Sequence, residues 1–351
     1  MFRGEKHINI IGGGIAGLAA AIACARSGKA VTIYERAAAF EEVGAGLQLG
    51  PNAVGALQAL GAWEAVAPIT YAPPAILMRK AGSGRVAKEI PLGENFTRRF
   101  SQPYRVAQRA DLHGALLQVV RSMPPVEIIL GREIEAFNLT GPVIAADGIG
   151  SRTRQWLFPE AQARPTTNLI FRALVPMPEN GNLRLDCVNL WMFPHGHVVT
   201  YPVGRDHKLN VVVVTQGKNP RDHFFKACSE LKNLLAQVPA WLEWPTAFVP
   251  PLPVWHKDQV MLIGDAAHGT LPFLAQGAAM ALEDAAALFT CDSAPSFEQA
   301  RRSRCQRLHQ QTLATGRIYH LDWPLSQARD LVLRFTPGQL PLERLEWLYS
   351  S

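Results

Sequence analysis

A glycine cluster near the N-terminus has the spacing of a phosphate-binding turn. Gly12, Gly14 and Gly17 form a GxGxxG motif that follows a run rich in β-branched residues at 7–11 and precedes an alanine-rich stretch at 16–26. In a strand–turn–helix unit, the first glycine permits the tight turn, the second lets a pyrophosphate approach the amides at the helix N-terminus, and the third allows the helix to pack closely on the strand. The motif therefore predicts a bound dinucleotide rather than a glycine-rich turn without a ligand.

An acidic residue and two neighbours of the turn extend this predicted dinucleotide site. Glu35 follows a second apolar run at 30–34, which completes a strand–turn–helix–strand unit. Its carboxylate can accept hydrogen bonds from the hydroxyl groups of an adenosine ribose, which argues against a 2′-phosphate at that position. We expect Arg36, beside it, and Ala16, at the start of the helix, to lie against the same ligand.

Two more segments place acidic residues at the ends of apolar runs. The first reads VIAADGIGSRTR at 143–154 and carries Asp147. The second reads VMLIGDAAHGTLPFLAQGAAMALEDA at 260–285, with Asp265 after the apolar run, a loop that contains proline, and a predicted helix from about Gly277. An acid at a strand end can accept hydrogen bonds from the hydroxyl groups of a ligand, although Asp265 could instead cap the next helix.

A histidine and a tyrosine are the candidates for chemistry on a substrate. Residues 190–214 are predicted to form two apolar strands around a turn at 204–208, and His197 and Tyr201 share one face of a strand because side chains alternate. Imidazole has an ordinary pKa of about 6.5, which suits a general base. The alternative is that His197 is a core or surface histidine whose hydrogen bonds are satisfied within the protein. His195 and His197 form an HxH pattern that could bind a metal, but the sequence shows no third ligand cluster to complete the site.

Composition and charge exclude several classes of protein. The 35 Lys and Arg against 29 Asp and Glu give a net charge of +6, which can attract anionic small molecules but is too small for a nucleic-acid-binding surface. The five cysteines form no CxxC pair, which predicts a reducing cytoplasm rather than a disulfide framework or a structural zinc site. Residues 8–25 carry no charge, but four glycines among them favour a strand, a turn and a helix start over a membrane span.

Together the three motifs resemble those of the single-component FAD-dependent aromatic hydroxylases, the family of para-hydroxybenzoate, salicylate and 3-hydroxybenzoate hydroxylases. The pattern is GxGxxG, then DGxxSxxR from Asp147, then GDAAHxxxPxxxQGxxxxxED at 264–284, and the resemblance extends through 44–60, 104–117 and the tail from 316. It implies an α/β fold in which a Rossmann-like FAD-binding domain of the GR2 type is interleaved with a β-sheet substrate domain and followed by a C-terminal helical tail.

The same resemblance predicts which segments form each part of the chain. The FAD-binding domain takes 1–72, 103–166 and 257–320, the substrate domain takes 73–102 and 167–256, and the tail takes 321–351. The joins at 138–141 and 290–294 are shorter than the family pattern. This indicates either deletions or loop residues absent from the sequence, and we favour the second.

The resemblance assigns roles around the flavin. Asp265 hydrogen-bonds the ribityl chain, and the helix that begins with Gly277 and Ala278 points its positive end at the pyrimidine side of the ring. Arg109 precedes Asp111, the predicted N-cap of another helix. The resemblance implies that Arg109 reaches the FAD phosphates or the ribityl chain, and the alternative is a surface cation at a helix start.

Further expectations concern NAD(P)H, the second nucleotide that the resemblance implies. Asp147 and Arg154 correspond to a fingerprint that the family shares between flavin and pyridine nucleotide, with Asp147 bonding to a cation such as Arg109. The sequence contains no second GxGxxG unit, so NAD(P)H is expected to bind transiently in an open groove. Gln48 stands where the family varies a residue that faces either the flavin or the substrate.

On the substrate side, the family carries a histidine and a tyrosine at the spacing of His197 and Tyr201. The resemblance implies that His197 is the base for the substrate hydroxyl, that Tyr201 orients the ring, and that Gln276 contacts the ring from the flavin side. We interpret His268 as structural and Cys187 as a core thiol. A solvated helix face is the interpretation for Arg301, Arg302, Arg304 and Arg307.

The activity that the resemblance implies is an FAD-dependent monooxygenase that uses NAD(P)H and O₂ to hydroxylate a phenolic or heteroaromatic acid through a flavin hydroperoxide. The acid would be similar to 3-hydroxybenzoate, salicylate or a hydroxynicotinate. The alternatives are an epoxidase, an antibiotic-modifying or quinone-pathway hydroxylase, and a flavin-binding protein without catalysis. We expect a monomer or homodimer with no nucleic-acid partner and no integral membrane segment.

Overall fold

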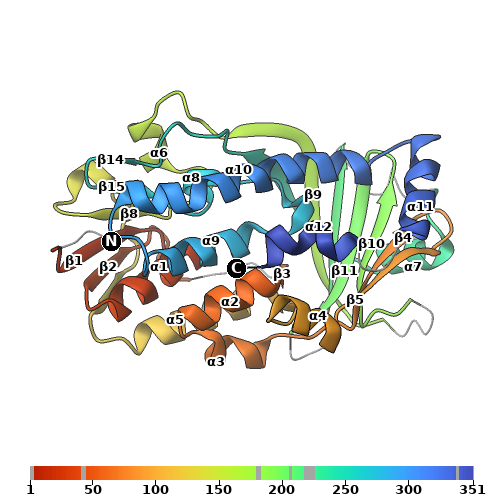
Figure 1. The fold of residues 1–351 in the computed structure, drawn as a ribbon, viewed down its shortest axis with the longest axis horizontal. Coiled ribbons are helices and arrows are strands. Elements are labelled where there is room, and N and C mark those ends of the chain that lie inside the picture. The colour runs from red at the N-terminus through yellow and green to blue at the C-terminus, as the bar shows by residue number, and fades with distance from the viewer. Residues whose placement is uncertain are drawn as a thin grey trace.

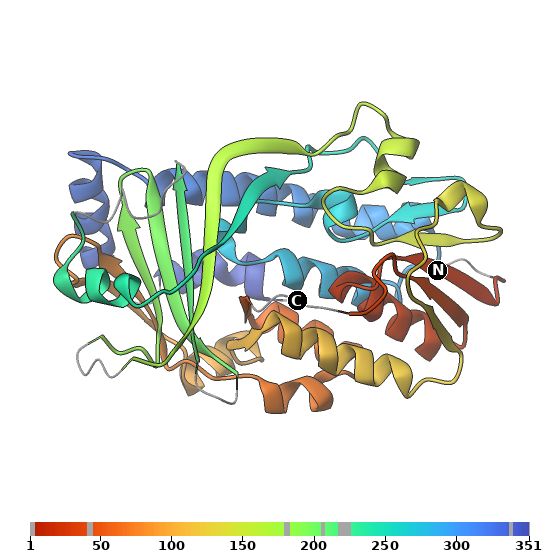
Figure 2. The same ribbon diagram turned by 180° about the vertical axis from the view of Figure 1, so that it is seen from behind.

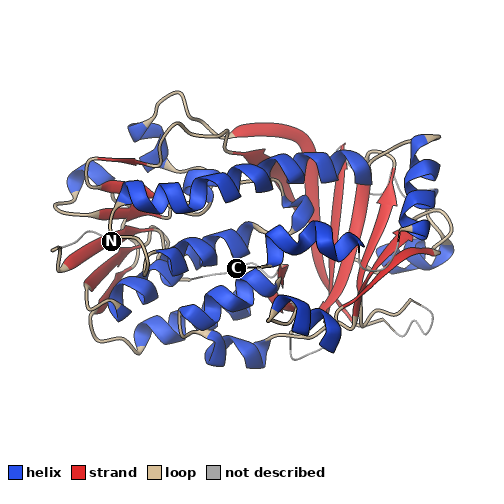
Figure 3. Cartoon of the chain, in the orientation of Figure 1, coloured by secondary structure: helices blue, strands red, loops and turns tan. Residues whose placement is uncertain are grey.

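Two β-sheets stand at opposite ends of an elongated molecule, and helices connect them (Figures 1 and 3). The computed structural model describes residues 4–40, 45–178, 183–204, 208–216, 226–336 and 340–350. The N-terminus lies at the smaller sheet, and Figure 2 shows the larger sheet from behind, at the far end of the molecule.

The smaller sheet has six strands and carries the glycine turn. Its strands are β1 (His7–Ile11), β2 (Ala30–Tyr34), β7 (Val126–Ile129), β8 (Val143–Ala145), β14 (His256–Lys257) and β15 (Val260–Leu262). The spatial order is β14-β15-β8-β1-β2-β7, with β14 antiparallel to β15 and the other pairs parallel. Ile8 and Ile10 of the central strand are fully buried, as expected for a parallel sheet under helices.

The larger sheet has seven strands. They are β4 (Ala75–Lys80), β5 (Val86–Pro91), β9 (Arg164–Pro176), β10 (Val188–Phe193), β11 (Gly196–Val203), β12 (Lys208–Gln216) and β13 (Leu242–Phe248). Their order is β13-β9-β12-β11-β10-β4-β5. The two strands predicted for 190–214 are in fact parts of three, because a turn at 194–195 separates β10 from β11, and most of the predicted turn at 204–208 lies outside the described residues.

The helices pack between and around the sheets, and a short two-stranded sheet of β3 (Gly46–Leu49) and β6 (Arg105–Gln108) lies beside them. The helices are α1 (Ile15–Arg26), α2 (Pro51–Ala59), α3 (Trp63–Val66), α4 (Glu94–Phe100), α5 (Arg109–Arg121), α6 (Arg152–Leu157), α7 (Ser229–Ala236), α8 (Asp265–His268), α9 (Gly277–Ala287), α10 (Ala294–Tyr319), α11 (Leu325–Phe335) and α12 (Leu340–Tyr349). Among the described residues, no helix combines the length and the apolar character that crossing a bilayer requires.

The two helices predicted next to the cofactor motifs are confirmed as α1 and α9, which pack against each other. The small side chains of α1 permit this close approach, and Ala19, Ala20 and Ala21 have no exposed surface. The predicted N-cap at Asp111 is wrong. Gln108 holds the N-cap position of α5 because the helix begins directly after β6, and Asp111 lies in its first turn.

The predicted helical tail is confirmed as α11 and α12. The first of these helices packs on β5 of the seven-stranded sheet, and the second returns to α2. The ring of Tyr349 makes edge contacts with Phe96, Phe100 and Tyr104, with centroids 5.4 to 6.2 Å away. These contacts hold the end of the chain against the body of the molecule.

The arginine run on α10 is not a solvated face. Arg301 is 6% exposed and forms ion pairs with Glu283 and Asp284 of α9. Arg304 pairs with Glu283 and donates to the backbone oxygen of Trp347. The prediction holds for the exposed Arg307 and is wrong for Arg301, Arg302 and Arg304. Buried carboxylates need counter-ions, and these carboxylates are on α9 for Arg301 and Arg304 and on α10 itself, at Glu298, for Arg302.

Both short joins are accommodated by regular local structure. Asn9 holds the first, since its backbone N–H donates to Pro142 O and its side-chain amide to Thr140 O, each at 3.0 Å. The second join ends in a capping box, in which Ser293 and Ser296 bond reciprocally at the start of α10. The expectation that loop residues are absent from the sequence at these joins stays a prediction.

Candidate active site

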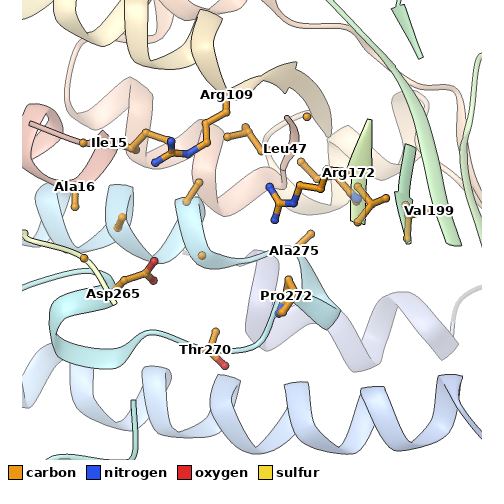
Figure 4. A pocket seen from close by; sticks show the side chains of 18 of the residues that line it. Ile15, Ala16, Leu47, Arg109, Arg172, Val199, Asp265, Thr270, Pro272 and Ala275 are labelled. Carbon is orange, nitrogen blue, oxygen red and sulfur yellow. The ribbon is translucent and has the colours of Figure 1, made fainter. Parts of the chain in front are cut away.

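A cavity of about 370 Å³ lies between the glycine turn, the N-terminus of α9 and the seven-stranded sheet. Figure 4 shows Ala16 and Asp265 toward one end of it and Arg172 and Val199 toward the other. The cavity wall brings together nine of the predicted site residues, namely Gly14, Ala16, Gln48, Arg109, His197, Tyr201, Asp265, Gly277 and Ala278. Segments far apart in the sequence therefore meet at one place.

A second cavity, of about 520 Å³, adjoins the same turn, since Gly14 lines both cavities. Glu35 lines this second cavity, and its carboxylate accepts hydrogen bonds from the backbone N–H groups of Gly13 (2.7 Å) and Ala37 (2.9 Å). These bonds fix the carboxylate at the end of β2, at the position predicted to meet a ribose. The ring of His113, which also lines this cavity, bonds to Gly13 O at 2.7 Å and anchors the turn.

The three glycines of the motif differ in what surrounds them. Gly12 has a left-handed backbone (φ +100°), and a Cβ there would lie 2.5 Å from Ala146 O. A Cβ on Gly17 would lie 1.9 Å from Gly12 O, so this position needs glycine for packing within the protein. A Cβ on Gly14 would meet no protein atom within 4 Å, so the space beside it is left for a ligand. Gly12 and Gly17 thus shape the turn, and Gly14 faces the cavities.

The donor and acceptor groups around the first cavity fit FAD. Asp147 accepts a hydrogen bond from Thr153 N at 3.1 Å, and its Oδ1 is buried with no partner among the described residues. Gly277 begins α9, and a Cβ on it would meet nothing within 4 Å. An exposed residue at the helix start and a free approach to Gly14 are what the phosphates of FAD require. Asp147 itself lines neither cavity.

Asp265 is exposed to the cavity. Burial by the surrounding protein raises the pKa of its carboxyl group above the ordinary value, against the lowering effect of His268 and Arg109. Figure 4 shows Asp265 and Arg109 extending into the cavity from opposite sides. A carboxylate in this place can accept hydrogen bonds from ligand hydroxyl groups.

A buried ion network supports the turn that carries Asp265. The Asp284 carboxylate has no exposed surface and accepts from Gly264 N (2.8 Å), His268 Nε2 (2.6 Å) and Arg301 Nε (2.8 Å). Although burial opposes ionisation, His268 and Arg301 lower the pKa of Asp284 to about 2. Cys305 lies within 4.8 Å of the His268 and Asp284 ligand atoms, but Arg301 already neutralises the acid, so the cluster is structural.

Arg154 also supports the site from outside the cavity. Its side chain has no exposed surface and donates to the backbone oxygens of Ala161 (2.9 Å) and Ala266 (3.0 Å). Burial lowers the pKa of its guanidinium, and nearby acids oppose this shift. Arg154 therefore connects α6 to the Asp265 turn and does not line the cavity that a nucleotide would enter.

His197 projects from β11 into the cavity at the end away from the glycine turn. It is 4% exposed, and its Nδ1 bonds to Nε2 of His320 at 2.9 Å. Burial, and then the neighbouring His320, lower the pKa of His197 to about 3. The ring is therefore neutral at physiological pH, with Nδ1 held by His320.

Sequence reasoning missed His320. This residue follows the last turn of α10, and burial lowers its pKa to about 4. Its ring lies 5.2 Å from that of His197 and 5.6 Å from that of Phe273, centroid to centroid. The two histidines are 123 positions apart and no local motif surrounds the second, so the pairing arises from the tertiary fold alone.

Tyr201 and Gln48 complete the wall beside His197. Tyr201 is 3% exposed, and burial raises the pKa of its phenol, against the effects of Arg172 and Gln48. The hydroxyl group of Tyr104 donates to Gln48 Oε1 at 2.5 Å. The predicted shared face of His197 and Tyr201 is confirmed, since both line the cavity.

Five predicted site residues line neither cavity. Gly12 and Gly17 shape the turn and Asp147 bonds to Thr153, which leaves Gln276 and Arg36. Gln276 is 3% exposed, and its side-chain oxygen accepts from Asn52 Nδ2 at 2.9 Å, so its amide is directed to α2. Arg36 is exposed on the surface after β2. Neither residue appears in the cavity wall.

Arg172 of β9 is a cavity residue that sequence reasoning did not identify. Figure 4 shows its guanidinium inside the cavity beside Leu47 and Val199. The sequence does contain a signal for it. Arg172 interrupts the apolar sequence LIFRALV at 169–175, and a charged residue inside a buried apolar strand is uncommon without a partner or a function.

Comparison with known proteins agrees with this geometry. Residues 10–40 match the family described as an NAD(P)-binding Rossmann-like domain, and residues 252–317 match the FAD binding domain family. The chain is 33% identical to 3-hydroxybenzoate 6-hydroxylase of Polaromonas naphthalenivorans (strain CJ2), over 99% of this chain and 96% of that protein. It is 30% identical to 6-hydroxynicotinate 3-monooxygenase of Bordetella bronchiseptica, over 82% of each chain.

The fold is also shared with solved structures. Klebsiella pneumoniae HpxO complexed with FAD and uric acid matches with a TM-score of 0.83 at 22% identity, over 99% of this chain and 98% of that one. The full-length relatives, the FAD-binding match and a cavity suited to FAD lead to one conclusion. This chain belongs to the family of FAD-dependent aromatic hydroxylases.

Proposed function

We propose that this enzyme hydroxylates a phenolic acid similar to 3-hydroxybenzoate, with NAD(P)H and O₂ as co-substrates. The observation that carries the proposal is a buried, neutral His197 inside the cavity that the glycine turn and the α9 N-terminus enclose. The names of the full-length relatives, which include 3-hydroxybenzoate 6-hydroxylases and a 6-hydroxynicotinate 3-monooxygenase, support this class of substrate.

FAD, when bound, would accept reducing equivalents from NAD(P)H and would activate O₂. Its proposed ligands are the residues predicted for it without Arg36, which lines neither cavity. They are Gly12, Gly14, Ala16, Gly17, Glu35, Gln48, Arg109, Asp147, Asp265, Gly277 and Ala278. The geometry supports Gly14, Glu35, Asp265 and Gly277 most directly, because these line the two cavities. The positive end of α9 would stabilise negative charge on a flavin ring bound there by about 1 kcal/mol, and by more where water is excluded.

His197 is the proposed general base. It takes the proton of the substrate hydroxyl, which enriches the ring positions ortho and para to that group in electrons, as electrophilic attack requires. His320 holds Nδ1 and so fixes the orientation of the ring. Tyr201 orients the substrate, while Val199, Val212 and Val214 present apolar walls that exclude water.

Other features of the chain are proposed on the same basis. The FAD-binding domain comprises 1–72, 103–166 and 257–320, and the substrate domain comprises 73–102 and 167–256. The enzyme works in the cytoplasm, which the five free cysteines support. It is a monomer or a homodimer.

NAD(P)H oxidation by the purified protein tests the proposal. The FAD-loaded protein is assayed with a panel of hydroxybenzoates and hydroxynicotinates, and the products are identified by mass. We expect at least one acid to stimulate oxidation and to gain one oxygen atom. A protein without a flavin spectrum even after FAD addition, or an oxidation rate that no aromatic acid changes, contradicts the proposal.

A further inference from the structure

The guanidinium of Arg172 lies inside the cavity, and no described residue supplies a counter-ion for it. Its Nε is buried with no hydrogen-bond partner among the described residues, and no carboxylate of those residues lies within ion-pair distance of it. The ring of Trp244 covers it, with Cζ 5.6 Å from the ring centroid. Burial lowers the pKa of Arg172, which indicates that the charge is poorly solvated. A cation in this state costs free energy unless an anion pairs with it.

The register of the sheet places Arg172 opposite the proposed base. Val199 of β11 pairs with Val212 of β12, and Val212 pairs with Arg172 of β9. These three side chains form one row on the face that carries His197, two residues along β11 from Val199. Since neighbouring strands are about 4.8 Å apart, the backbone of Arg172 lies roughly 10 Å across the sheet from β11. The row between them is apolar, as a benzene ring would require.

The other arginine of the cavity occupies a different place. Arg109 extends from the start of α5, and Figure 4 shows it near Ile15 and across from Asp265, at the end of the cavity that the glycine turn forms. Arg172 lies at the other end, beside Val199. The cavity thus offers one cation toward the cofactor motifs and one toward the substrate sheet.

We propose that Arg172 binds the carboxylate of the aromatic acid while His197 receives the proton of its hydroxyl group. The inference rests on the proposed function and names the part of the substrate that this function leaves open. A guanidinium fork matches the two oxygens of a carboxylate, and such a pair is strong where water is excluded. An acid with its hydroxyl meta or para to the carboxylate can reach both anchors. An ortho hydroxyl bonds to its own carboxylate and cannot.

Ligand titration of the FAD-loaded protein tests this assignment. Binding of 2-, 3- and 4-hydroxybenzoate and of the uncharged 3-hydroxybenzamide is followed by the change in flavin absorbance, for wild type, Arg172→Gln and Arg172→Lys. The control is Arg164→Gln, an exposed arginine on the same strand. FAD content and melting temperature verify that each variant is folded.

We expect Arg172→Gln to raise the Kd of 3-hydroxybenzoate by about 10- to 100-fold and to leave that of 3-hydroxybenzamide within about threefold. Arg172→Lys should fall between, and Arg164→Gln should match wild type. In wild type, the 3- or the 4-isomer should bind more tightly than the 2-isomer.

Distinct results would overturn the assignment. If the folded Arg172→Gln protein binds the acid and the amide more weakly by the same factor, or binds both as wild type does, Arg172 does not contact the carboxylate. A raised KM for NAD(P)H with unchanged aromatic Kd values assigns Arg172 to the nicotinamide cofactor instead. Tightest binding of 2-hydroxybenzoate contradicts the two-anchor geometry. Wild-type protein that binds none of the four compounds contradicts the proposed function itself.

Discussion

At the scale of single residues, the site depends on a histidine that is kept neutral. Burial and the ring of His320 lower the pKa of His197 to about 3 in the ligand-free protein, so the ring enters the reaction unprotonated. A substrate that brings negative charge into the same cavity favours the protonated imidazole and raises this pKa. The base therefore gains proton affinity when the acid is bound, which ties proton transfer to substrate binding.

Replacing His197 should separate catalysis from cofactor binding. We expect His197→Ala to lower kcat for hydroxylation by about 10²- to 10⁴-fold, the range for loss of a general base, and to divert NAD(P)H oxidation toward hydrogen peroxide. FAD content should be unchanged, because His197 lies at the far end of the cavity from the glycine turn. The measurements are product yield per NAD(P)H and flavin absorbance.

The matched control for this variant is His195→Asn. His195 is exposed and has a left-handed backbone (φ +63°), which asparagine tolerates. The His195→Asn variant should hydroxylate the substrate with the wild-type kcat and product yield. Unchanged product yield per NAD(P)H in His197→Ala would remove His197 from the proton transfer.

The pH dependence of stability follows from the same residue. The folded pKa of His197 is about 3 against an ordinary 6.5, so the unfolded chain binds more protons between these values. Stability is then full above about pH 6.5 and falls as the pH drops toward 3. We expect the unfolding free energy of His197→Asn, measured in urea at several pH values, to depend less steeply on pH in this window. Parallel curves for the variant and wild type would contradict the buried neutral state.

At the scale of elements, the β1–α1 turn shows how one motif combines two requirements. Gly17 is needed for contact within the protein, since its Cβ would fall 1.9 Å from Gly12 O. Gly14 faces open space in both cavities. The same residue type thus serves packing at one position and ligand approach at the other, three residues along.

Alanine substitutions should distinguish these two roles. We expect Gly14→Ala to keep the melting temperature of the FAD-free protein within a few degrees of wild type and to weaken FAD binding at least tenfold. Gly17→Ala should destabilise the FAD-free protein by about 1–3 kcal/mol, as overpacking does. Thermal melts of FAD-free protein and FAD titration check both. The interpretation fails if the two variants lose FAD affinity and stability in the same proportion.

At the scale of the whole molecule, the sequence predicted those parts of the site whose residues are neighbours along the chain. The glycine turn, the shared face of His197 and Tyr201, and the start of α9 at Gly277 follow from local periodicity and turn chemistry. His320 and Arg172 could not be assigned roles in this way. They acquire them from contacts across long sequence separations and from strand register.

The arginines of α10 likewise acquire their roles from tertiary contacts. A run of charges predicts a solvated face only while its partners are unknown, and Glu283 and Asp284 on α9 reverse that interpretation for Arg301. Gln276 was placed in the site from its motif, but its amide is directed to Asn52. Motifs locate backbone segments well, whereas side-chain direction depends on the packed environment.

The most direct test of the account follows the origin of the new oxygen atom. FAD-loaded protein is supplied with NAD(P)H, 3-hydroxybenzoate and ¹⁸O₂, and the aromatic products are analysed by mass spectrometry, with 4-hydroxybenzoate in parallel. The account predicts a dihydroxybenzoate that carries one ¹⁸O atom, with one NAD(P)H consumed and the second oxygen atom released as water. Reducing equivalents that appear entirely as hydrogen peroxide, with no labelled aromatic product from either acid, would contradict it.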